Sequence, residues 1–529
     1  NQFKNFTGET NDLRINVNKS SSFTVIGKDP FVGMKLEFQD LVKDSTIQFN
    51  NLKNVQILKY LILGIILIAG LFWVFLNNIV QLFFKIKTSI YILDYVMFSM
   101  VILLCFFFFN QGDILHTGGS SFTYLNGHIR GFYEVNKELM GGNNYMPSTY
   151  VLFALWNIPV WLCGFVEKAT LNVGYVLFWY KLLTTVCLAV ATLFLYKIGK
   201  VICNDAKNIK ILPIIWVTSP ILIFGQFIFG QYDIITVMFT IIGVYYFFKR
   251  NIKLFVLFFS VAFTFKYFPL FVFIPLLFMV EKRPLRLILI LALSQIPSFF
   301  ESFFYRSSEA YKEGVGGFFA LKSMFTASFA ITENVSLCVF ITIWLVFCGT
   351  LYVKTYRDSK DFNNWATYVL MSVPAVFFIF VYWHPQWLVF LTPFMAMTAI
   401  NNKHLNYFML LDFVVMIPFI GYVVNHWVLN VDQQMWILGL LGQFNPNLCD
   451  PEKAYKMQNL FFRNVPEVQS IFYSMIAAYL IINIILKYPN KENDVLCRPD
   501  INYLRLRIFG GVSVFIIPAV ISYIITMSR

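Results

Sequence analysis

The chain has 529 residues, of which 58% are hydrophobic, 19% are aromatic and only 13% are charged. A soluble domain carries about twice that charged fraction. Apolar runs of about 18 or more residues recur along the chain, as in helices that cross a bilayer. These features exclude an ordinary soluble protein and predict an all-α polytopic membrane protein.

The formal net charge is +13, and its distribution indicates membrane topology rather than nucleic-acid binding. Lysines and arginines gather in short segments between apolar runs, as the positive-inside rule predicts for a cytoplasmic face. The 8 cysteines form no Cys-x-x-Cys pair and mostly lie within apolar runs. We therefore expect no disulfide framework, no metal site and no cofactor.

Residues 1–54 have a different pattern. Polar and apolar residues alternate at 22–26 and 34–38, with turn-forming Gly and Pro residues between them, which favours short strands. We expect a small β-rich extracytoplasmic appendage, with carbohydrate binding and a packing role both open, ahead of a membrane domain at 55–529. Because the chain begins at Asn1 rather than at a methionine, we also expect a segment upstream.

The first two predicted spans are 56–76 and 91–109, and the second leads into a polar outer loop at 110–148. The next apolar run, 150–166, is interrupted by Asn157 and Pro159. If it crossed the membrane, the lysines of 197–210 would fall outside. We therefore interpret it as an interfacial helix on the outer surface, and we place the following spans at 174–196, 211–227 and 234–248.

The apolar segment 254–279 is interrupted at its middle by Lys266 and Pro269, and both of its flanks are cationic. Two half-helices of about 12 residues that turn within the outer half of the bilayer satisfy the charge rule, and such broken helices occur where they line a protein-enclosed cavity. The alternative is a single ordinary crossing.

The remaining runs predict about twelve crossings in all, in addition to the broken re-entrant hairpin. These later spans fall at 287–299, 335–352, 365–381, 387–400, 407–423, 471–486 and 509–527. The segments 301–334, 383–386 and 425–469 then lie on the outer side.

Candidate functional residues concentrate on this outer side. Ionisable groups at membrane depth are costly and tend to mark function, and Lys266 would attract an anion. The alternatives for Lys266 are snorkelling to the interface or pairing with an acid such as Asp233. Asp113 and His116 begin the first outer loop, where they either act on a substrate or merely face water.

Two polar turns each allow two interpretations, and one lysine within a predicted span has no explanation from the sequence. The turn that contains Gln231, Tyr232 and Asp233 either binds substrate or lets Asp233 cap the next helix. The turn at 383–387 places a histidine between two tryptophans, as in a binding site or an aromatic belt. Lys181 lies inside a span, and the sequence identifies no partner for it.

The order of these elements resembles the GT-C superfamily of polytopic membrane glycosyltransferases, which take sugar from a polyprenyl-phosphate donor. The resemblance covers roughly residues 90–400. Within this range the motifs are similar to those of the dolichol-linked glucosyl- and mannosyltransferases and their bacterial relatives. It departs from the eukaryotic enzymes after the histidine, where they have Glu-Lys and this chain has Pro385-Gln386. The matching elements are Asp113 in the first large outer loop, the interfacial helix after it, Gly230-Gln231-Tyr232-Asp233, Phe265-Lys266-Tyr267-Phe268-Pro269 and His384-Pro385-Gln386-Trp387.

The resemblance implies a GT-C-like fold and an inverting hexosyl transfer. Asp113 would be the general base on an acceptor hydroxyl, and cations would stabilise the lipid phosphate as it leaves. The candidates for binding the donor phosphate and lipid are Lys266 and His384, with Arg130 and Arg306 in reserve. The candidates for binding substrate are His116, Gln231, Tyr232, Asp233 and Trp383.

Other function classes stay open at this point. A lipid-linked-sugar transporter or flippase shares broken helices and intramembrane charge, but it is expected to show a repeated half, which is not evident here. A polysaccharide polymerase or ligase and a non-enzymatic scaffold are further alternatives.

The richness in Phe, Ile, Lys and Asn suggests an AT-rich bacterial genome and therefore a bacterial plasma membrane, and the predicted topology places the active site on its outer face. The partners would then be an undecaprenyl-phosphate sugar, a cell-envelope glycan or lipid-linked acceptor, and membrane lipid, but no nucleic acid.

Overall fold

The computed structural model describes residues 14–17, 23–26, 92–163, 173–203, 206–317, 323–400, 402–426, 455–490 and 499–528. The predicted span at 56–76 and the predicted strand at 34–38 lie outside these residues. Within 1–54, β1 (Arg14–Val17) pairs antiparallel with β2 (Phe23–Ile26), and β2 falls where the first strand is predicted. The role and extent of the proposed appendage stay predictions.

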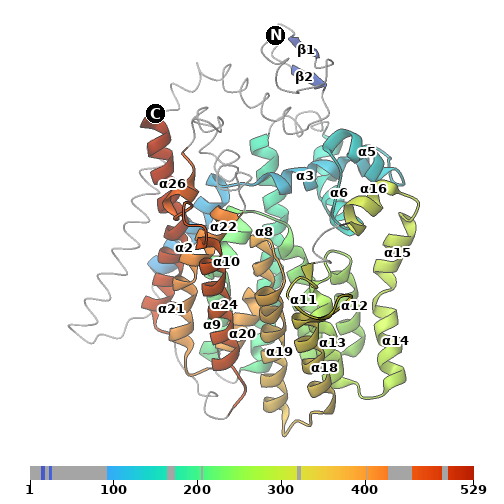
Figure 1. The fold of residues 1–529 in the computed structure, drawn as a ribbon, viewed down its shortest axis with the longest axis vertical. Coiled ribbons are helices and arrows are strands. Elements are labelled where there is room, and N and C mark those ends of the chain that lie inside the picture. Colours follow the sequence, from blue (N-terminus) through green and yellow to red (C-terminus); the bar gives the residue numbers. More distant parts are fainter. Residues whose placement is uncertain are drawn as a thin grey trace, which may run out of the picture.

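The described chain is a helical bundle with a smaller helical cap at one end (Figure 1). The bundle helices on the N-terminal side are α2 (Ile92–Phe108), α8 (Val173–Ile202), α9 (Ala206–Val217), α10 (Pro220–Ile223), the π-helix η1 (Phe224–Ile228), α11 (Asp233–Phe248), α12 (Ile252–Phe263), α13 (Phe268–Val280), α14 (Pro284–Ser294) and α15 (Ile296–Phe304).

The later bundle helices pack beside these. They are α18 (Val339–Val353), α19 (Ser359–Phe380), the 3-10 helix η3 (Pro385–Phe390), α20 (Thr392–Ala399), α21 (Leu405–Val414), α22 (Met416–His426), α24 (Val468–Leu486), α25 (Ile501–Arg505), the π-helix η7 (Leu506–Gly510) and α26 (Gly511–Ser528).

Several of these helices can cross a membrane. Among the described residues, six helical segments have the length and hydropathy of a span, or up to eight if two bent helix pairs each count as one span. The protein is therefore a helical protein with the properties of an integral membrane protein. The total of about twelve crossings stays a prediction.

The segment predicted as a broken hairpin forms two separate helices, α12 and α13, that pack against each other, while the position of their turn within a bilayer stays a prediction. The ring of Phe273 in α13 lies 4.9, 5.2 and 5.4 Å from those of Phe255, Phe259 and Phe263 in α12. Such contacts require the two helices to run antiparallel, side by side. Each helix is only about 18–20 Å long at 1.5 Å per residue, which is less than the roughly 30 Å hydrocarbon core.

Two predicted spans have different local structure. The run predicted to span 335–352 begins with β4 (Val335–Cys338), which pairs antiparallel with β3 (Ser328–Thr332), and its helix begins only at Val339. The run at 387–400 divides into η3 and the eight-residue α20. Pro393 lacks the N–H that a continuous helix needs at this point and is tolerated only in a first turn, so two short helices replace one.

The cap consists of α3 (Gly112–Ser120), α4 (Phe122–Leu125), α5 (Phe132–Met140), α6 (Pro147–Leu162), α16 (Glu309–Tyr311) and the π-helix η2 (Lys312–Gly316). It has its own buried aromatic cluster, which includes Phe132, Tyr133, Tyr150, Tyr305 and Tyr311. Figure 1 shows α6 beside α3, α5 and α16, so the run interpreted as an interfacial helix belongs to the cap.

Asn157 attaches α6 to its neighbours. Its side-chain amide donates to the Gly118 carbonyl and the Ser121 hydroxyl at 3.2 and 2.9 Å, and its oxygen accepts from the Trp179 indole at 3.0 Å. The residue that interrupts the apolar run in the sequence therefore joins α6 to α3 and to the start of α8.

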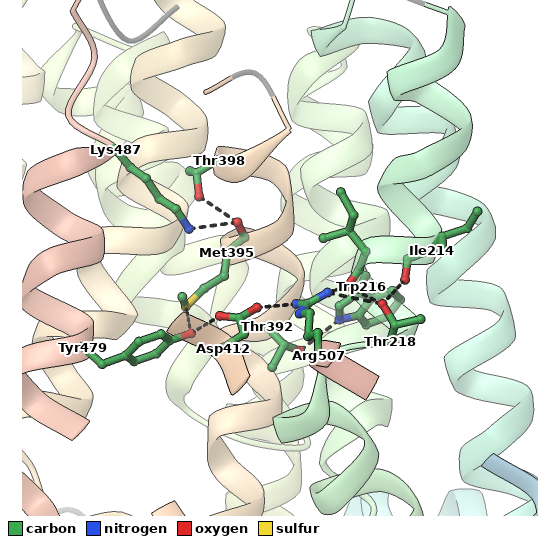
Figure 2. A network of polar contacts seen from close by, with 11 residues as sticks. Ile214, Trp216, Thr218, Thr392, Met395, Thr398, Asp412, Tyr479, Lys487 and Arg507 are labelled. Atoms are coloured by element: carbon green, nitrogen blue, oxygen red, sulfur yellow. Dashed lines mark hydrogen bonds and ion pairs between the residues drawn. The ribbon is translucent and has the colours of Figure 1, made fainter. Parts of the chain in front are cut away.

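Buried ion pairs fasten the C-terminal helices to the rest of the bundle. Arg505 binds both carboxylate oxygens of Asp94 in α2, at 2.7 and 2.9 Å. Figure 2 shows a second pair, in which Asp412 lies between Arg507 at 2.5 Å and the Tyr479 hydroxyl at 2.5 Å. Arg507 also donates to the Ile215 carbonyl at the end of α9.

Candidate active site

Asp113 lies in the first turn of α3, just beyond the apolar helix α2. The helix pair bends by 68° between α2 and α3, and α3 crosses the end of the bundle (Figure 1). Gln111 caps α3, because its side-chain oxygen accepts from the Asp113 backbone N–H at 2.7 Å. The amino end of a helix favours an ionised carboxylate, so this position suits an acid that must lose its proton.

Gln231 brings a distant turn to Asp113. Its side-chain nitrogen donates to Asp113 Oδ2 at 2.7 Å and to the Tyr145 hydroxyl at 3.0 Å. The turn requires Gly230, whose φ of +76° is a left-handed conformation that other residues rarely adopt. The Gly-Gln-x-Asp element thus places an amide against the proposed base.

Lys181 fixes the relative position of these two segments. Its ammonium, buried in the bundle, donates to the carbonyls of Phe106, Phe109 and Phe227 at 2.5, 2.8 and 2.8 Å. The first two carbonyls lie at the carboxyl end of α2, which leads to Asp113, and the third lies in η1, which leads to Gly230. The partner that the sequence did not identify is therefore a set of free carbonyls at helix ends.

Lys266 pairs with Asp233, as one alternative in the sequence analysis anticipates. Lys266 Nζ lies 2.5 Å from Asp233 Oδ1, and both side chains are almost entirely buried. The ammonium also lies 4.8 Å from the ring centre of Tyr232 and 5.4 Å from that of Trp387. A cation near two aromatic rings is held by their ring quadrupoles. Among the described residues, Asp233 Oδ2 has no hydrogen-bond partner.

The surroundings shift the pKa values of Asp113 and His116, the two ionisable residues in the first helix of the cap. Burial raises the pKa of Asp113 above its ordinary value, while the Gln231 amide, His116 and Lys266 oppose that shift. Burial lowers the pKa of His116, whose Nε2 lies 3.1 Å from the Met140 carbonyl. A carboxylate with a raised pKa is a better proton acceptor than an ordinary one.

His384 is held near this cluster but is neutral. Its ring lies 4.8 Å from that of Trp387, and burial together with Lys266 and His426 lowers its pKa to about 3. The imidazole therefore acts at neutral pH as a hydrogen-bonding group and not as a cation. The adjacent Trp383 turns inward, where it donates to the Phe378 carbonyl at 2.8 Å and is fully buried.

The two reserve arginines lie elsewhere on the cap. Arg130 and Arg306 are exposed, and Arg306 stacks over the Phe303 ring at 3.7 Å. The Tyr305 hydroxyl donates to the Ile129 carbonyl at 2.9 Å, so the two arginines belong to neighbouring segments. Within the described part of the chain, neither contacts the cluster around Asp113.

The structure thus brings six of the predicted residues into one cluster, together with one that was not predicted. The predicted residues are Asp113, His116, Gln231, Tyr232, Asp233 and Lys266. The residue that was not predicted is Tyr145, whose ring lies 4.7 Å from that of Tyr232 and 5.9 Å from Lys266 Nζ. In the sequence, Tyr145 is marked only by its position two residues before Pro147, which begins α6.

The cluster thus combines a buried carboxyl group, Asp113, with a buried ion pair between Lys266 and Asp233. In the described ranges, no group of three or more His, Cys, Asp and Glu side chains is arranged to hold a metal ion. Comparisons with protein-family models, with curated proteins and with solved structures find no match for this chain. The GT-C resemblance therefore stays a resemblance of motifs.

Proposed function

We propose that the chain is a membrane glycosyltransferase of the GT-C type. It would move a hexose from a polyprenyl-phosphate donor to a cell-envelope glycan or lipid-linked acceptor on the outer face, with inversion. The observation that supports this most directly is the hydrogen bond from Gln231 to Asp113. That bond unites two motifs 118 positions apart and orients a carboxylate whose pKa is raised.

In the proposed reaction, Asp113 accepts the proton of an acceptor hydroxyl as the oxygen attacks the anomeric carbon. A carbon–oxygen bond forms on one face of the sugar while the bond to the lipid phosphate breaks on the other. The bonding electrons leave with the phosphate, which is already an anion and needs no general acid. Gln231 holds the carboxylate so that one of its oxygens stays directed at the acceptor.

Lys266 is the proposed electrostatic partner of the leaving phosphate. Its ammonium is buried beside Tyr232 and Trp387, where a charge interacts more strongly than in water. The pairing with Asp233 keeps the cation satisfied before the donor binds, and a donor phosphate would share or displace that carboxylate. The neutral imidazole of His384 would add a hydrogen bond rather than charge.

The transporter alternative has one observation in its favour. Asp412, Arg507 and Lys487 are ionisable groups within the bundle (Figure 2), and such groups often serve ion or substrate coupling. However, each carboxylate oxygen of Asp412 already has a partner, Arg507 on one and the Tyr479 hydroxyl on the other, as expected of a structural ion pair. We therefore favour the transferase.

The test is transfer of labelled sugar from synthetic polyprenyl-phosphate donors to envelope lipid fractions by the purified chain. Asp113→Asn should abolish transfer while donor binding stays close to that of the wild type. Glu138→Gln, which removes an exposed carboxylate of the same cap, is the matched control and should keep full activity. Full activity in Asp113→Asn, or no transfer by the wild type across a panel of sugars, would reject the proposal, and flipping in liposomes would then be measured.

A further inference from the structure

A cavity at the opposite end of the bundle has no role in the proposed reaction. It measures about 130 Å³ and is lined by Phe247, Arg250, Ile252, Phe255 and Val280. It lies where α11 ends and α12 begins, one helix length from the turn that holds Gln231. Four of its lining side chains are apolar, and Arg250 supplies the only charge among them.

The backbone at Arg250 is held in an unusual conformation. Its φ of +57° is a left-handed conformation that residues with a side chain rarely adopt, and glycine would occupy it without strain. The guanidinium lies 3.6 Å above the ring of Phe362, and this ring in turn stacks on that of Phe247 at 5.5 Å. An arginine at this position is therefore not explained by the turn itself.

Two polar side chains have unused hydrogen-bonding capacity: Arg250, which lines the cavity, and Tyr356, which packs on the same Phe362 ring as Arg250. The Arg250 backbone N–H donates to the Phe247 carbonyl at 2.9 Å. Its exposed guanidinium makes neither a hydrogen bond nor an ion pair within the described ranges, so its five N–H donors are available to a ligand. The Tyr356 hydroxyl is buried and has no hydrogen-bond partner in the part of the chain that the structure describes, and its ring lies 5.0 Å from that of Phe362. Asp361 does not neutralise Arg250, and its carboxylate accepts from the Arg357 backbone N–H at 3.1 Å.

The surrounding surface is strongly basic. The segments 249–253, 281–286 and 354–361 contain nine lysines and arginines and three acids. Lys282 joins 281–286 to the end of α18, just before 354–361, because its ammonium donates to the carbonyls of Leu351 and Tyr352 at 2.9 and 2.6 Å. Arg250 joins 249–253 to the residue that follows 354–361, because its guanidinium lies over Phe362. The cavity therefore opens within a rim of positive charge.

We propose that this cavity binds the headgroup region of an anionic phospholipid from the leaflet on its side of the membrane. Arg250 would bind the phosphate through paired N–H donors, a geometry that suits a guanidinium, and Tyr356 would add a hydroxyl. A site for a whole drug-sized ligand is about 300 Å³ or more, so this cavity holds only the part of the lipid next to the phosphate. The acyl chains stay in the bilayer, as in basic headgroup pockets between membrane helices.

The experiment measures lipid bound to the purified full-length chain in neutral detergent by native mass spectrometry. Dioctanoyl-phosphatidylglycerol, dioctanoyl-phosphatidylcholine and inorganic phosphate are titrated separately. We expect phosphatidylglycerol to bind at least about tenfold more tightly than either of the other two, because the site combines charge with an apolar wall. Equal binding of the two lipids would overturn the proposal, and so would equal binding of inorganic phosphate.

Three variants assign the binding to the cavity. Arg250→Gly removes the cation but suits a φ of +57°, so it should fold at least as well as wild type while losing about tenfold in phosphatidylglycerol affinity. Tyr356→Phe removes one hydroxyl and should lose about threefold. Lys253→Gln removes an exposed charge of the same rim that does not line the cavity and should change affinity less than twofold. Wild-type affinity in Arg250→Gly would refute the site.

Discussion

Lys181→Met tests whether one buried lysine positions the proposed active site. The substitution keeps a long, flexible side chain but removes the ammonium that binds the carbonyls of Phe106, Phe109 and Phe227. Each buried carbonyl left without a partner costs about 1–3 kcal/mol, or about 3–9 kcal/mol for the three. Relief of the several kcal/mol spent on burying the ammonium offsets part of this. We expect a net loss of about 2–4 kcal/mol in the free energy of unfolding.

The same substitution should slow the proposed transfer even where the protein is folded. The ends of α2 and η1 would no longer be held together, so Gln231 would fit Asp113 less well, and a 1 Å misplacement costs about a hundredfold in rate. Unfolding in mixed micelles and sugar transfer by the folded fraction are the two measurements.

The control is Lys197→Met on the same helix. The Lys197 ammonium lies 4.3 Å from the ring centre of Phe194, and we expect a loss of less than about 1 kcal/mol. If Lys181→Met matched this control in both stability and rate, the positioning role would be wrong.

The remaining predictions concern the pKa of Asp113, the role of Lys266, the ion pair between Asp412 and Arg507, and the stability of the cap. Burial raises the pKa of Asp113, so the rate of transfer should fall as the pH is lowered. This fall should begin at a higher pH than it would for a carboxyl group with an ordinary pKa. Gln231→Leu removes a hydrogen bond to the ionised form and should move that limb of the kcat/KM profile to higher pH; an unchanged limb would contradict the geometry. Lys266→Met should weaken donor binding about tenfold in an equilibrium assay, whereas the exposed Lys312→Met should not, and equal affinities would leave Lys266 as a structural partner of Asp233. Asp412→Leu leaves Arg507 buried without its carboxylate and should cost about 3–5 kcal/mol in unfolding, of which Arg507→Leu in the same chain should restore most; a double variant as unstable as the single one would refute the pairing. Glu301→Gln weakens the acceptor for the Ser148 backbone N–H, 3.0 Å away, and should increase proteolysis of the cap without altering the bundle.

Hydrophobic runs and cationic segments determined much of the architecture in advance. Lipid has no water to satisfy backbone groups, so long apolar runs must become helices, and α2, α8, α19, α24 and α26 lie where the sequence places spans. The broken hairpin followed from Lys266, Pro269 and two cationic flanks. Precise ends were less predictable, because Val335–Cys338 is as apolar as a helix but pairs as a strand.

The candidate site was predictable only in part. Asp113, Gln231 and Lys266 each carry a polar group where the surrounding sequence is apolar, and that contrast made them visible. The neutral state of His384 was not visible, because it depends on burial and on Lys266 and His426 nearby. The sequence predicts Trp383 as a binding residue, but its indole is fully buried and donates to the Phe378 carbonyl.

The sequence by itself determined a membrane-spanning helical protein with its unusual polar residues gathered toward one side, because hydropathy and charge order are local properties of the chain. Only the tertiary structure decided which of those residues meet. The bond between Asp113 and Gln231 joins positions 118 apart, and the carbonyls that Lys181 binds are backbone groups without a side-chain signature. Contacts of this kind depend on how helix ends are packed, and the spacing of residues along a chain does not specify that.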